Sequence, residues 1–282
     1  MEQKSDAKVI ERFMQVLESE GCSPGTIKNY TRSIREFSGW LQENGGDINQ
    51  LTRVDVQQYI YHLERKGNTA TTIENKFAAL SVLASYLDAS HVLRNIRRPE
   101  VRKSRFIAPK SLDKNERNRV LREAERTRNK RSIAIVYLFL YSGLRVSEMV
   151  ALDRDDVVIG ERSGSIRVRK GKGNVSRNVP LPIEARLQLR QYLESRTDDD
   201  PALFLSNYRV RISVRSVQRV LEKFRVHPHQ LRHTYCRELV GAGVDIAIVA
   251  ELAGHADINV TRRYAKPTVQ ELEQAVDKAF CS

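Results

Sequence analysis

The residues best suited to chemistry gather in one short segment, His227-Pro228-His229-Gln230-Leu231-Arg232-His233. Pro228 has no backbone N–H and suits the first turn of a helix, so a helix is predicted to begin there. One face of this helix repeats apolar residues and should be buried: Leu231, Tyr235 and Leu239. Another face carries polar residues at i, i+3 and i+4 spacing: His229, Arg232, His233 and Cys236. We expect packing to leave this second face free for an anion such as phosphate, which a guanidinium fork and an imidazole both bind.

The same segment also permits metal binding, because imidazole and thiolate groups are zinc ligands. The candidate ligands are His227, His229, His233 and Cys236. The adjacent Arg232 would repel a cation, and the chain has no second Cys/His cluster. An anion site is therefore the favoured interpretation, and metal binding is its alternative.

Four residues elsewhere in the chain could extend this site: Arg145, Lys172, His255 and Tyr264. The first three stand beside glycines that end a helix or flank a hairpin turn. Three of them also have a structural interpretation. Arg145 could form an ion pair with Glu148 or Asp153, Lys172 could be only a solubilising charge on the hairpin, and Tyr264 could be only a packing residue.

Together these groups suit one reaction, the metal-free transesterification of a phosphodiester through a tyrosine. A phenol of pKa about 10 is a poor nucleophile at neutral pH unless cations stabilise its phenolate. Fixed Arg, His and Lys donors stabilise the charge that a phosphodiester gains under attack. A Lys or His can protonate the leaving alkoxide.

Charge is distributed unevenly along the 282 residues. Residues 1–100 hold 13 Lys and Arg against 13 Asp and Glu, so the net charge of +13 arises entirely beyond them. Such an excess favours a polyanion, above all a nucleic acid. Three cysteines without framework spacing, no membrane-length apolar run and a charged, non-signal-like N-terminus predict a cytoplasmic protein with no membrane partner.

The first ninety residues predict four helices with short connections, over about 7–20, 24–45, 52–67 and 71–87. Thr52 followed by Asp55 resembles a capping box, and Thr71 or Thr72 opens the fourth helix. Three basic residues share one side of the second helix and could contact phosphate: Lys28, Arg32 and Arg35. A solvated charged face explains them equally well.

A basic segment without periodicity, residues 91–110, predicts a linker between two domains. Its candidate DNA-binding residues are Arg97, Arg98, Arg102, Lys103 and Arg105.

Beyond the linker, residues 111–282 predict helices around a few short strands. The strands are expected at 157–159, 165–169 and 175–179, with a turn over 170–174. Helices are expected at 112–127, 133–141, 183–195, 216–224, 228–240, 246–253 and 268–280. Residues 133–141 are apolar on all sides and should be buried. The predicted fold class is mainly α with a small antiparallel sheet, α+β overall.

Five sequence blocks resemble the tyrosine recombinase (phage integrase) family. They are Ser142-Gly143-Leu144-Arg145-Val146-Ser147-Glu148, Gly171-Lys172-Gly173-Asn174 leading to Val179-Pro180-Leu181, His229-Gln230-Leu231-Arg232-His233-Thr234, Ala253-Gly254-His255 and Tyr264. All five occur in the order typical of the family and span roughly residues 110–270, which makes the resemblance specific. The chain length resembles the simpler Xer-like recombinases or transposon-encoded resolvases, without an added arm-binding module.

The resemblance implies a catalytic domain in which Tyr264 attacks a DNA phosphate held by five residues, Arg145, Lys172, His229, Arg232 and His255. It implies a 3′-phosphotyrosyl intermediate and a Holliday junction, with Lys172 as general acid and no cofactor, metal or ATP. Residues 1–90 would be the four-helix core-binding (SAM-like) domain on the other side of the DNA. The implied partners are double-stranded DNA with a specific core site and a homotetramer, a dimer per site. The helix 268–280 would dock in trans, although packing on its own domain is the alternative.

The expected function is site-specific DNA recombination, either resolution of dimers or cointegrates or integration and excision of a mobile element. Two other functions fit the same residues less fully. One is DNA relaxation of the type IB topoisomerase kind, and the other is DNA binding without catalysis.

Overall fold

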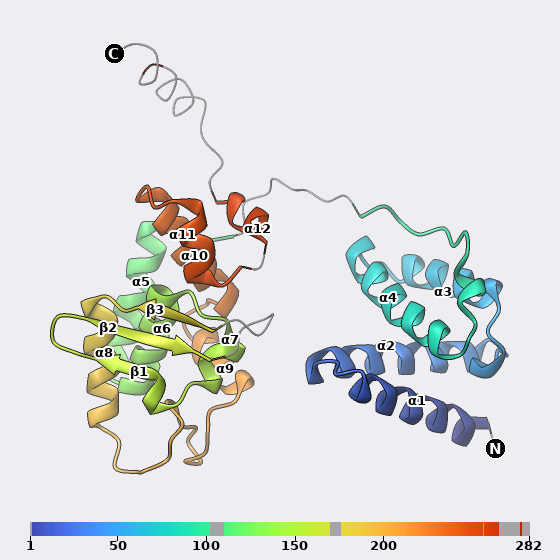
Figure 1. Cartoon of the computed structure of the whole chain (residues 1–282), viewed down its shortest axis with the longest axis horizontal. Helices are drawn as coiled ribbons and strands as arrows, with labels where there is room; N and C mark the ends of the chain where they lie inside the picture. Colours follow the sequence, from blue (N-terminus) through green and yellow to red (C-terminus); the bar gives the residue numbers. More distant parts are fainter. Residues whose placement is uncertain (1, 102–109, 170–175, 256, 265–276, 278–282) are drawn as a thin grey trace. The chain divides into compact units, whose positions relative to one another are not determined.

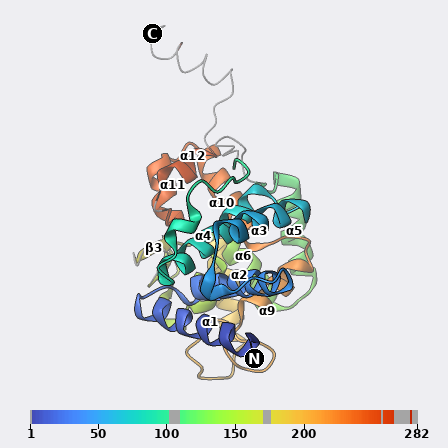
Figure 2. The ribbon, with the colours of Figure 1, turned by 90° about the vertical axis from the view of Figure 1, so that its right-hand side faces the viewer.

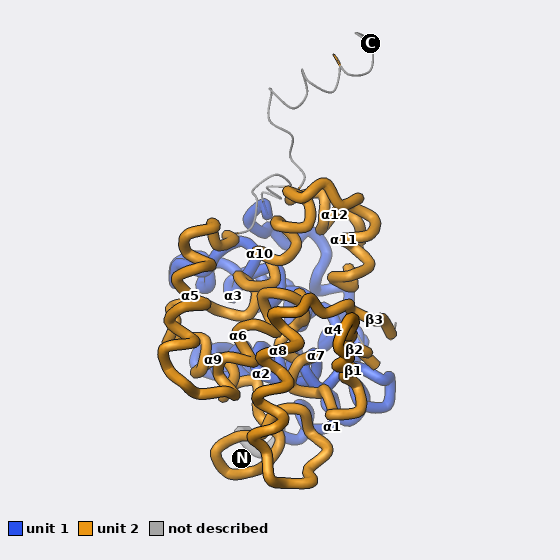
Figure 3. Tube along the Cα trace, turned by 90° about the vertical axis from the view of Figure 1, so that its left-hand side faces the viewer, with its two compact units in different colours: residues 1–103 blue, residues 104–282 orange. Residues whose placement is uncertain are grey.

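The computed structural model describes residues 2–101, 110–169, 176–255, 257–264 and 277 (Figure 1). The chain divides into two compact units, residues 1–103 and 104–282, shown in separate colours in Figure 3. Each unit has its own hydrophobic core. The first unit is helical and the second adds one three-stranded antiparallel sheet, so the predicted fold class is confirmed.

Four helices form the first unit: α1 Glu2–Ser19, α2 Pro24–Glu43, α3 Arg53–Arg65 and α4 Ala70–Tyr86. The helix α2 lies between α1 and α4 and contacts both (Figures 1 and 2). The capping box of Thr52 and Asp55 forms as predicted. The fourth helix begins earlier than predicted, because Thr69 caps it by accepting a hydrogen bond from the backbone N–H of Thr72.

Residues 90–98 pack against α3 and α4 within the first unit. The side chain of Gln57 exchanges two hydrogen bonds with the backbone of Arg97, at 2.8 and 3.0 Å. The Arg98 guanidinium pairs with Glu74 at 2.6 Å and lies 4.2 Å from the centre of the Phe77 ring. The start of the predicted linker therefore packs on α3 and α4, while its extent as a linker stays a prediction.

The second unit is built around α6 Lys130–Ser142, whose residues 132–140 are all buried, as the apolar sequence predicts. The other α-helices described in this unit are α5 Lys114–Arg126, α7 Val146–Ala151, α8 Ile183–Glu194, α9 Val214–Glu222, α10 Pro228–Gly241, α11 Ile246–Ala253 and α12 Ile258–Arg262. α7 was not predicted as a helix from the sequence. It is only six residues long and too short to show a periodic pattern.

The sheet has the order β1-β2-β3, with β1 Val157–Ile159, β2 Gly164–Val168 and β3 Arg177–Pro180. Ile166 of β2 pairs with Val157 on one side and Val179 on the other, and Ile166 and Val179 are fully buried. The strands lie within two residues of their predicted bounds. The predicted turn at 170–174 and, apart from residue 277, the predicted helix at 268–280 lie outside the described residues.

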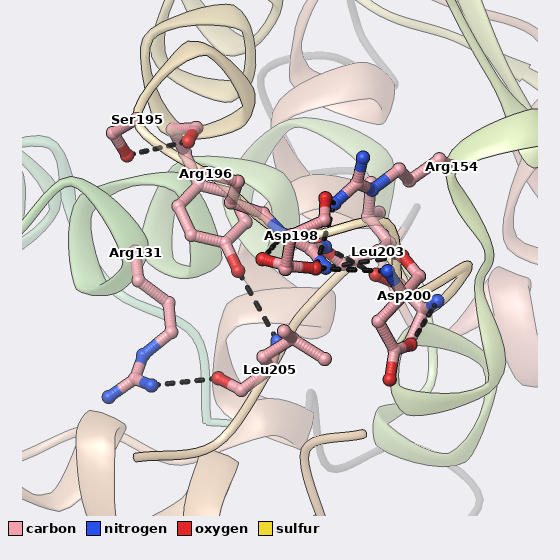
Figure 4. A network of polar contacts seen from close by, with 10 residues as sticks. Arg131, Arg154, Ser195, Arg196, Asp198, Asp200, Leu203 and Leu205 are labelled. Atoms are coloured by element: carbon pink, nitrogen blue, oxygen red, sulfur yellow. Dashed lines mark hydrogen bonds and ion pairs between the residues drawn. The ribbon is translucent and has the colours of Figure 1, made fainter. Parts of the chain in front are cut away.

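The loop between α8 and α9 is held by the side chain of Arg196, as Figure 4 shows. It donates to the carbonyl oxygens of Ala202 and Leu203 at 2.5 and 3.0 Å and pairs with Asp198. This pairing holds the pKa of Asp198 down at about 2. The backbone N–H of Leu203 then bonds to the carbonyl of Leu152 at 2.9 Å, so the loop fixes the C-terminal end of α7.

Candidate active site

Arg232 lies at the centre of the candidate site and is 4% exposed. His227 caps α10 by accepting a hydrogen bond from the backbone N–H of Gln230 at 3.2 Å, which fixes the helix start as predicted. The Arg232 Nη1 donates to the carbonyl oxygen of Gly143 at 2.5 Å. Its Nη2 is buried without a hydrogen-bond partner in the described part of the chain. Burial, reinforced by the positive charge of Arg145, lowers the pKa of Arg232 to about 10.

The prediction that packing leaves this face of α10 free is wrong for two of its four residues. Arg232 and Cys236 are buried because α6 and α11 both pack against α10. The buried surface of α10 is therefore wider than the single apolar stripe predicted from the sequence. Cys236 lies in a hydrophobic cluster with Tyr235, Val249 and Ala253. His233 is partly buried and His229 remains exposed.

Arg145 reaches the same place from the other side. The helix α6 ends at Gly143 in the left-handed conformation, with φ of 60°, and Arg145 then becomes the N-cap of α7. Its Nη1 pairs with Glu148 at 2.7 Å, so the ion pair considered from the sequence does form. Its Nη2 donates to the carbonyl oxygen of Gly254 at 2.6 Å. The ion pair therefore orients the guanidinium toward the turn that carries His255.

A residue that the sequence analysis missed, Arg177 of β3, completes this arrangement. Arg177 contacts Glu148 with both Nη atoms, at 3.1 and 2.8 Å, and donates from Nε to the carbonyl of Leu252 at 3.0 Å. Burial alone would raise the pKa of Glu148, but hydrogen bonds from Arg177 and Arg145 hold it below its usual range. The alternation of side chains along β3 could have indicated its burial, because it puts Arg177 on the same side of the strand as buried Val179.

His255 follows Gly254, which ends α11 with φ of 65°. Its Nδ1 is hydrogen-bonded to the hydroxyl of Thr261, a fully buried residue of α12, at 2.8 Å. Burial, followed by the positive charges of Arg232 and Arg145, lowers the pKa of His255 to about 4. His255 is therefore neutral at pH 7 and lies within the field of both arginines.

Tyr264 directly follows the last turn of α12 and packs against the hydrophobic cluster that contains Cys236. Its hydroxyl is hydrogen-bonded to Nδ1 of His233, the residue after Arg232. Burial raises the pKa of Tyr264, and the positive charges of Arg232 and Arg263 oppose that rise. The described residues thus bring six side chains to the N-terminal end of α10: Arg145, Arg232, His229, His233, His255 and Tyr264.

Comparison with known proteins gives these groups a context. Residues 110–271 match the Phage integrase family, and residues 10–91 match the Phage integrase, N-terminal SAM-like domain. The tyrosine recombinase XerA of Thermococcus kodakarensis is 35% identical over 281 residues, covering 96% of this chain and 95% of its own. The chain belongs to the phage integrase family. The predicted family and enzyme class, site-specific DNA recombination by a tyrosine recombinase, are thereby confirmed, and the topoisomerase and binding-only alternatives are not favoured.

Solved structures of recombinases share this fold. A crystal structure of XerA recombinase covers 97% of this chain and 98% of its own, with 26% identity and a TM-score of 0.52. The XerH site-specific recombinase, solved with its difH substrate before cleavage, covers 95% of this chain and 84% of its own, with 20% identity and a TM-score of 0.71. The second likeness concerns the fold alone.

The remaining predicted residues of this integrase-family chain are distributed over both units. Lys28, Arg32 and Arg35 are exposed on α2, on the side away from buried Ile27 and Ile34. Arg97 is held through its backbone by α3, and the Arg98 side chain contacts α4. Four predicted residues lie outside the described part of the chain: Lys172, Arg102, Lys103 and Arg105.

Two further properties concern only the residues that the structure describes. They contain no group of three or more His, Cys, Asp or Glu side chains arranged to hold a metal ion. Across the same ranges, every helix is too short or too polar to cross a membrane.

Proposed function

We propose that this chain cuts and rejoins DNA at a specific core site, with Tyr264 as the nucleophile. The observation that carries the proposal is the convergence of Arg145 and Arg232 on one end of α10, each hydrogen-bonded to the carbonyl of a helix-ending glycine. Guanidinium groups fixed in this way need no rearrangement to stabilise charge on a phosphate. Tyr264 lies close to the same place, because its hydroxyl is hydrogen-bonded to His233, the residue next to Arg232.

In the proposed reaction, Arg145, Arg232, His229 and His255 bind the non-bridging oxygens of the scissile phosphate. The hydroxyl oxygen of Tyr264 attacks phosphorus, and the bond to the 5′ oxygen breaks. Lys172 protonates that oxygen, which gives a 3′-phosphotyrosyl link and a free 5′-hydroxyl. A 5′-hydroxyl from the partner duplex then attacks the link, so strands are exchanged through a Holliday junction without loss of bond energy.

The proposed partner is double-stranded DNA, bound by a homotetramer with one dimer per site. XerH was solved with a DNA substrate, and the exposed basic side of α2 fits a phosphate backbone. We further propose residues 1–90 as the core-binding domain, 91–110 as the linker and 111–282 as the catalytic domain. The segment 268–280 would be the helix that docks in trans on the next subunit. A cytoplasmic location follows from action on cellular DNA.

The experiment uses a labelled duplex selected from a random pool by its binding to the protein, and nicked beside the expected cleavage position. The nick lets the cut fragment leave, so a covalent protein–DNA adduct accumulates. We expect an adduct with the wild type and none with Tyr264→Phe, while Arg215→Ala, an exposed residue of α9, forms it normally. A wild type without adduct contradicts the proposal. Four-stranded junctions from two intact duplexes separate recombination from relaxation.

A further inference from the structure

We propose that His233 accepts the proton of Tyr264 as its oxygen attacks the phosphate, a role that rests on the proposed function and adds a catalytic residue to it. The two side chains are already joined, since Tyr264 Oη and His233 Nδ1 share a hydrogen bond. Their ring centroids are 5.8 Å apart with planes inclined by 42°, so the contact is edge to edge through these two atoms rather than a stack.

The position of His233 connects the nucleophile to the phosphate site. His233 is the neighbour of Arg232 on α10 and lies one helical turn beyond His229, with ring centroids 6.4 Å apart. A base at this position contacts the attacking oxygen. In the described part of the chain neither His229 nor His255 is hydrogen-bonded to the phenol, and Nδ1 of His255 is bonded to Thr261. Among the described residues, two titratable groups are hydrogen-bonded to the phenol, His233 and Cys236. Burial raises the pKa of Cys236 to about 11, so its thiol keeps its proton at neutral pH and His233 is the partner that can accept one.

The phenol needs such a base. Its burial raises the pKa of Tyr264, so the hydroxyl keeps its proton at neutral pH. Burial and surrounding positive charge lower the pKa of His233 to about 4, which keeps the imidazole neutral and able to accept a proton. The charged or titratable groups around His233 are His227, His229, Arg232, His255, Arg263 and Tyr264.

A phosphate bound beside Arg232 would make His233 a stronger base. Part of the downward shift of its pKa comes from Arg232, whose charge a phosphodiester anion would offset. The basicity of His233 therefore rises when the scissile phosphate is in place. This coupling favours activation of Tyr264 in the complex with DNA.

The proposed step balances as follows. The bond from Tyr264 Oη to phosphorus forms while the bond from phosphorus to the 5′ oxygen breaks. The phenol proton moves to Nδ1 of His233, which becomes an imidazolium, and Lys172 gives a proton to the 5′ oxygen. In the rejoining step a 5′-hydroxyl attacks phosphorus and gives its proton back to Lys172, while the imidazolium returns its proton to the departing Tyr264 oxygen.

His233 could instead only hold the phenol in place, and one substitution separates the two roles. In His233→Asn the amide oxygen lies close to where Nδ1 was, so it accepts the hydrogen bond from Tyr264 but takes no proton at neutral pH. We expect His233→Asn to form adduct about 10²- to 10⁴-fold more slowly at pH 7, the usual contribution of a general base. DNA affinity in a gel shift should stay within a few fold. His91→Asn, at an exposed histidine of the first unit, is the matched control.

Chemical rescue provides a second readout that a holding role would not change. In His233→Ala, added imidazole should restore adduct formation in proportion to its neutral form, and rescue should strengthen with the pKa of substituted imidazoles. His233→Asn should gain rate steadily as pH rises from 7 to 9, because hydroxide replaces the missing base.

The outcomes are distinct. Adduct formation by His233→Asn at the wild-type rate, with Tyr264→Phe inactive, overturns the role of His233 and leaves the proposed function intact. Lack of any imidazole rescue by a folded, DNA-binding His233→Ala overturns it too. A wild type that forms no Tyr264-dependent adduct overturns both proposals.

Discussion

Arg177 and Glu148 form a two-point ion pair, with Nη1–Oε1 and Nη2–Oε2 distances of 3.1 and 2.8 Å, and their side chains are only 8% and 3% exposed. The pair joins β3 to α7, and the Arg177 Nε bond to Leu252 adds α11. The elements that carry Arg145 and His255 are therefore tied together by one carboxylate and one guanidinium.

The first prediction concerns stability. Arg177→Ala leaves the buried Glu148 carboxylate paired only with Arg145, so we expect the free energy of unfolding to fall by about 3 kcal/mol. Urea denaturation of the full chain measures the change. The control is Arg215→Ala, whose partner Glu222 is exposed and where about 0.5 kcal/mol or less is expected. Equal losses in the two variants would show that the buried pair adds nothing.

The second prediction concerns the two arginines of the candidate site. Arg145→Ala and Arg232→Ala should each slow adduct formation by about 10²- to 10³-fold, because each removes a fixed donor to the developing charge. DNA affinity should change little, since many other phosphate contacts supply it. Single-turnover cleavage and gel shifts give the two numbers. Near-normal cleavage by either variant would place the site elsewhere.

Much of the fold follows from local rules in the sequence. Caps such as Thr52 with Asp55, the fully apolar run in α6 and the glycine after it predicted helix ends to within a few residues. The sequence also indicated His229 and Arg232, near the N-terminal end of α10, as candidate phosphate-binding residues. It could not show that Arg232 is buried, because its burial depends on α6 and α11 approaching from distant parts of the chain. The contact between Arg177 and Glu148 is equally non-local, spanning 29 positions.

The third prediction tests how His255 is oriented. Thr261→Val removes the hydroxyl that meets Nδ1 of His255 but keeps the side-chain volume. We expect about tenfold slower adduct formation, at the low end of the effects seen for residues that orient a site. Thr261→Ser retains the hydroxyl and should keep most of the rate. If the valine and serine variants cleave equally fast, the hydrogen bond does not orient His255.

The fourth prediction concerns pH and stability. His255 and His233 have pKa values of about 4 in the folded chain, against about 6.5 for an unfolded one. Between pH 6.5 and 4 the unfolded chain binds more protons, so the free energy of unfolding should fall as pH is lowered through this window. Urea midpoints at half-unit steps of pH measure the slope. The slope should flatten in His255→Asn, and an unchanged slope would assign it to other groups.

The fifth prediction concerns the exposed side of α2. Arg32→Ala should weaken DNA binding and lower the slope of log affinity against log salt by about one unit, as expected for one lost phosphate contact. Binding measured between low and moderate salt gives the slope. Arg215→Ala again serves as the control with an intact slope. A variant with reduced affinity but the wild-type slope would indicate a different cause.

Gly143 and Gly254 both adopt positive φ, and their carbonyl oxygens accept hydrogen bonds from Arg232 and Arg145. A Cβ on Gly254 would also come within 2.6 Å of the Arg177 guanidinium. Transplanting this constellation into another scaffold would therefore require copying two chain reversals as well as the side chains. A graft that reproduced every arginine and histidine on uninterrupted helices would lack these two carbonyl acceptors. Both guanidinium groups would then lose the hydrogen bonds that fix their orientation.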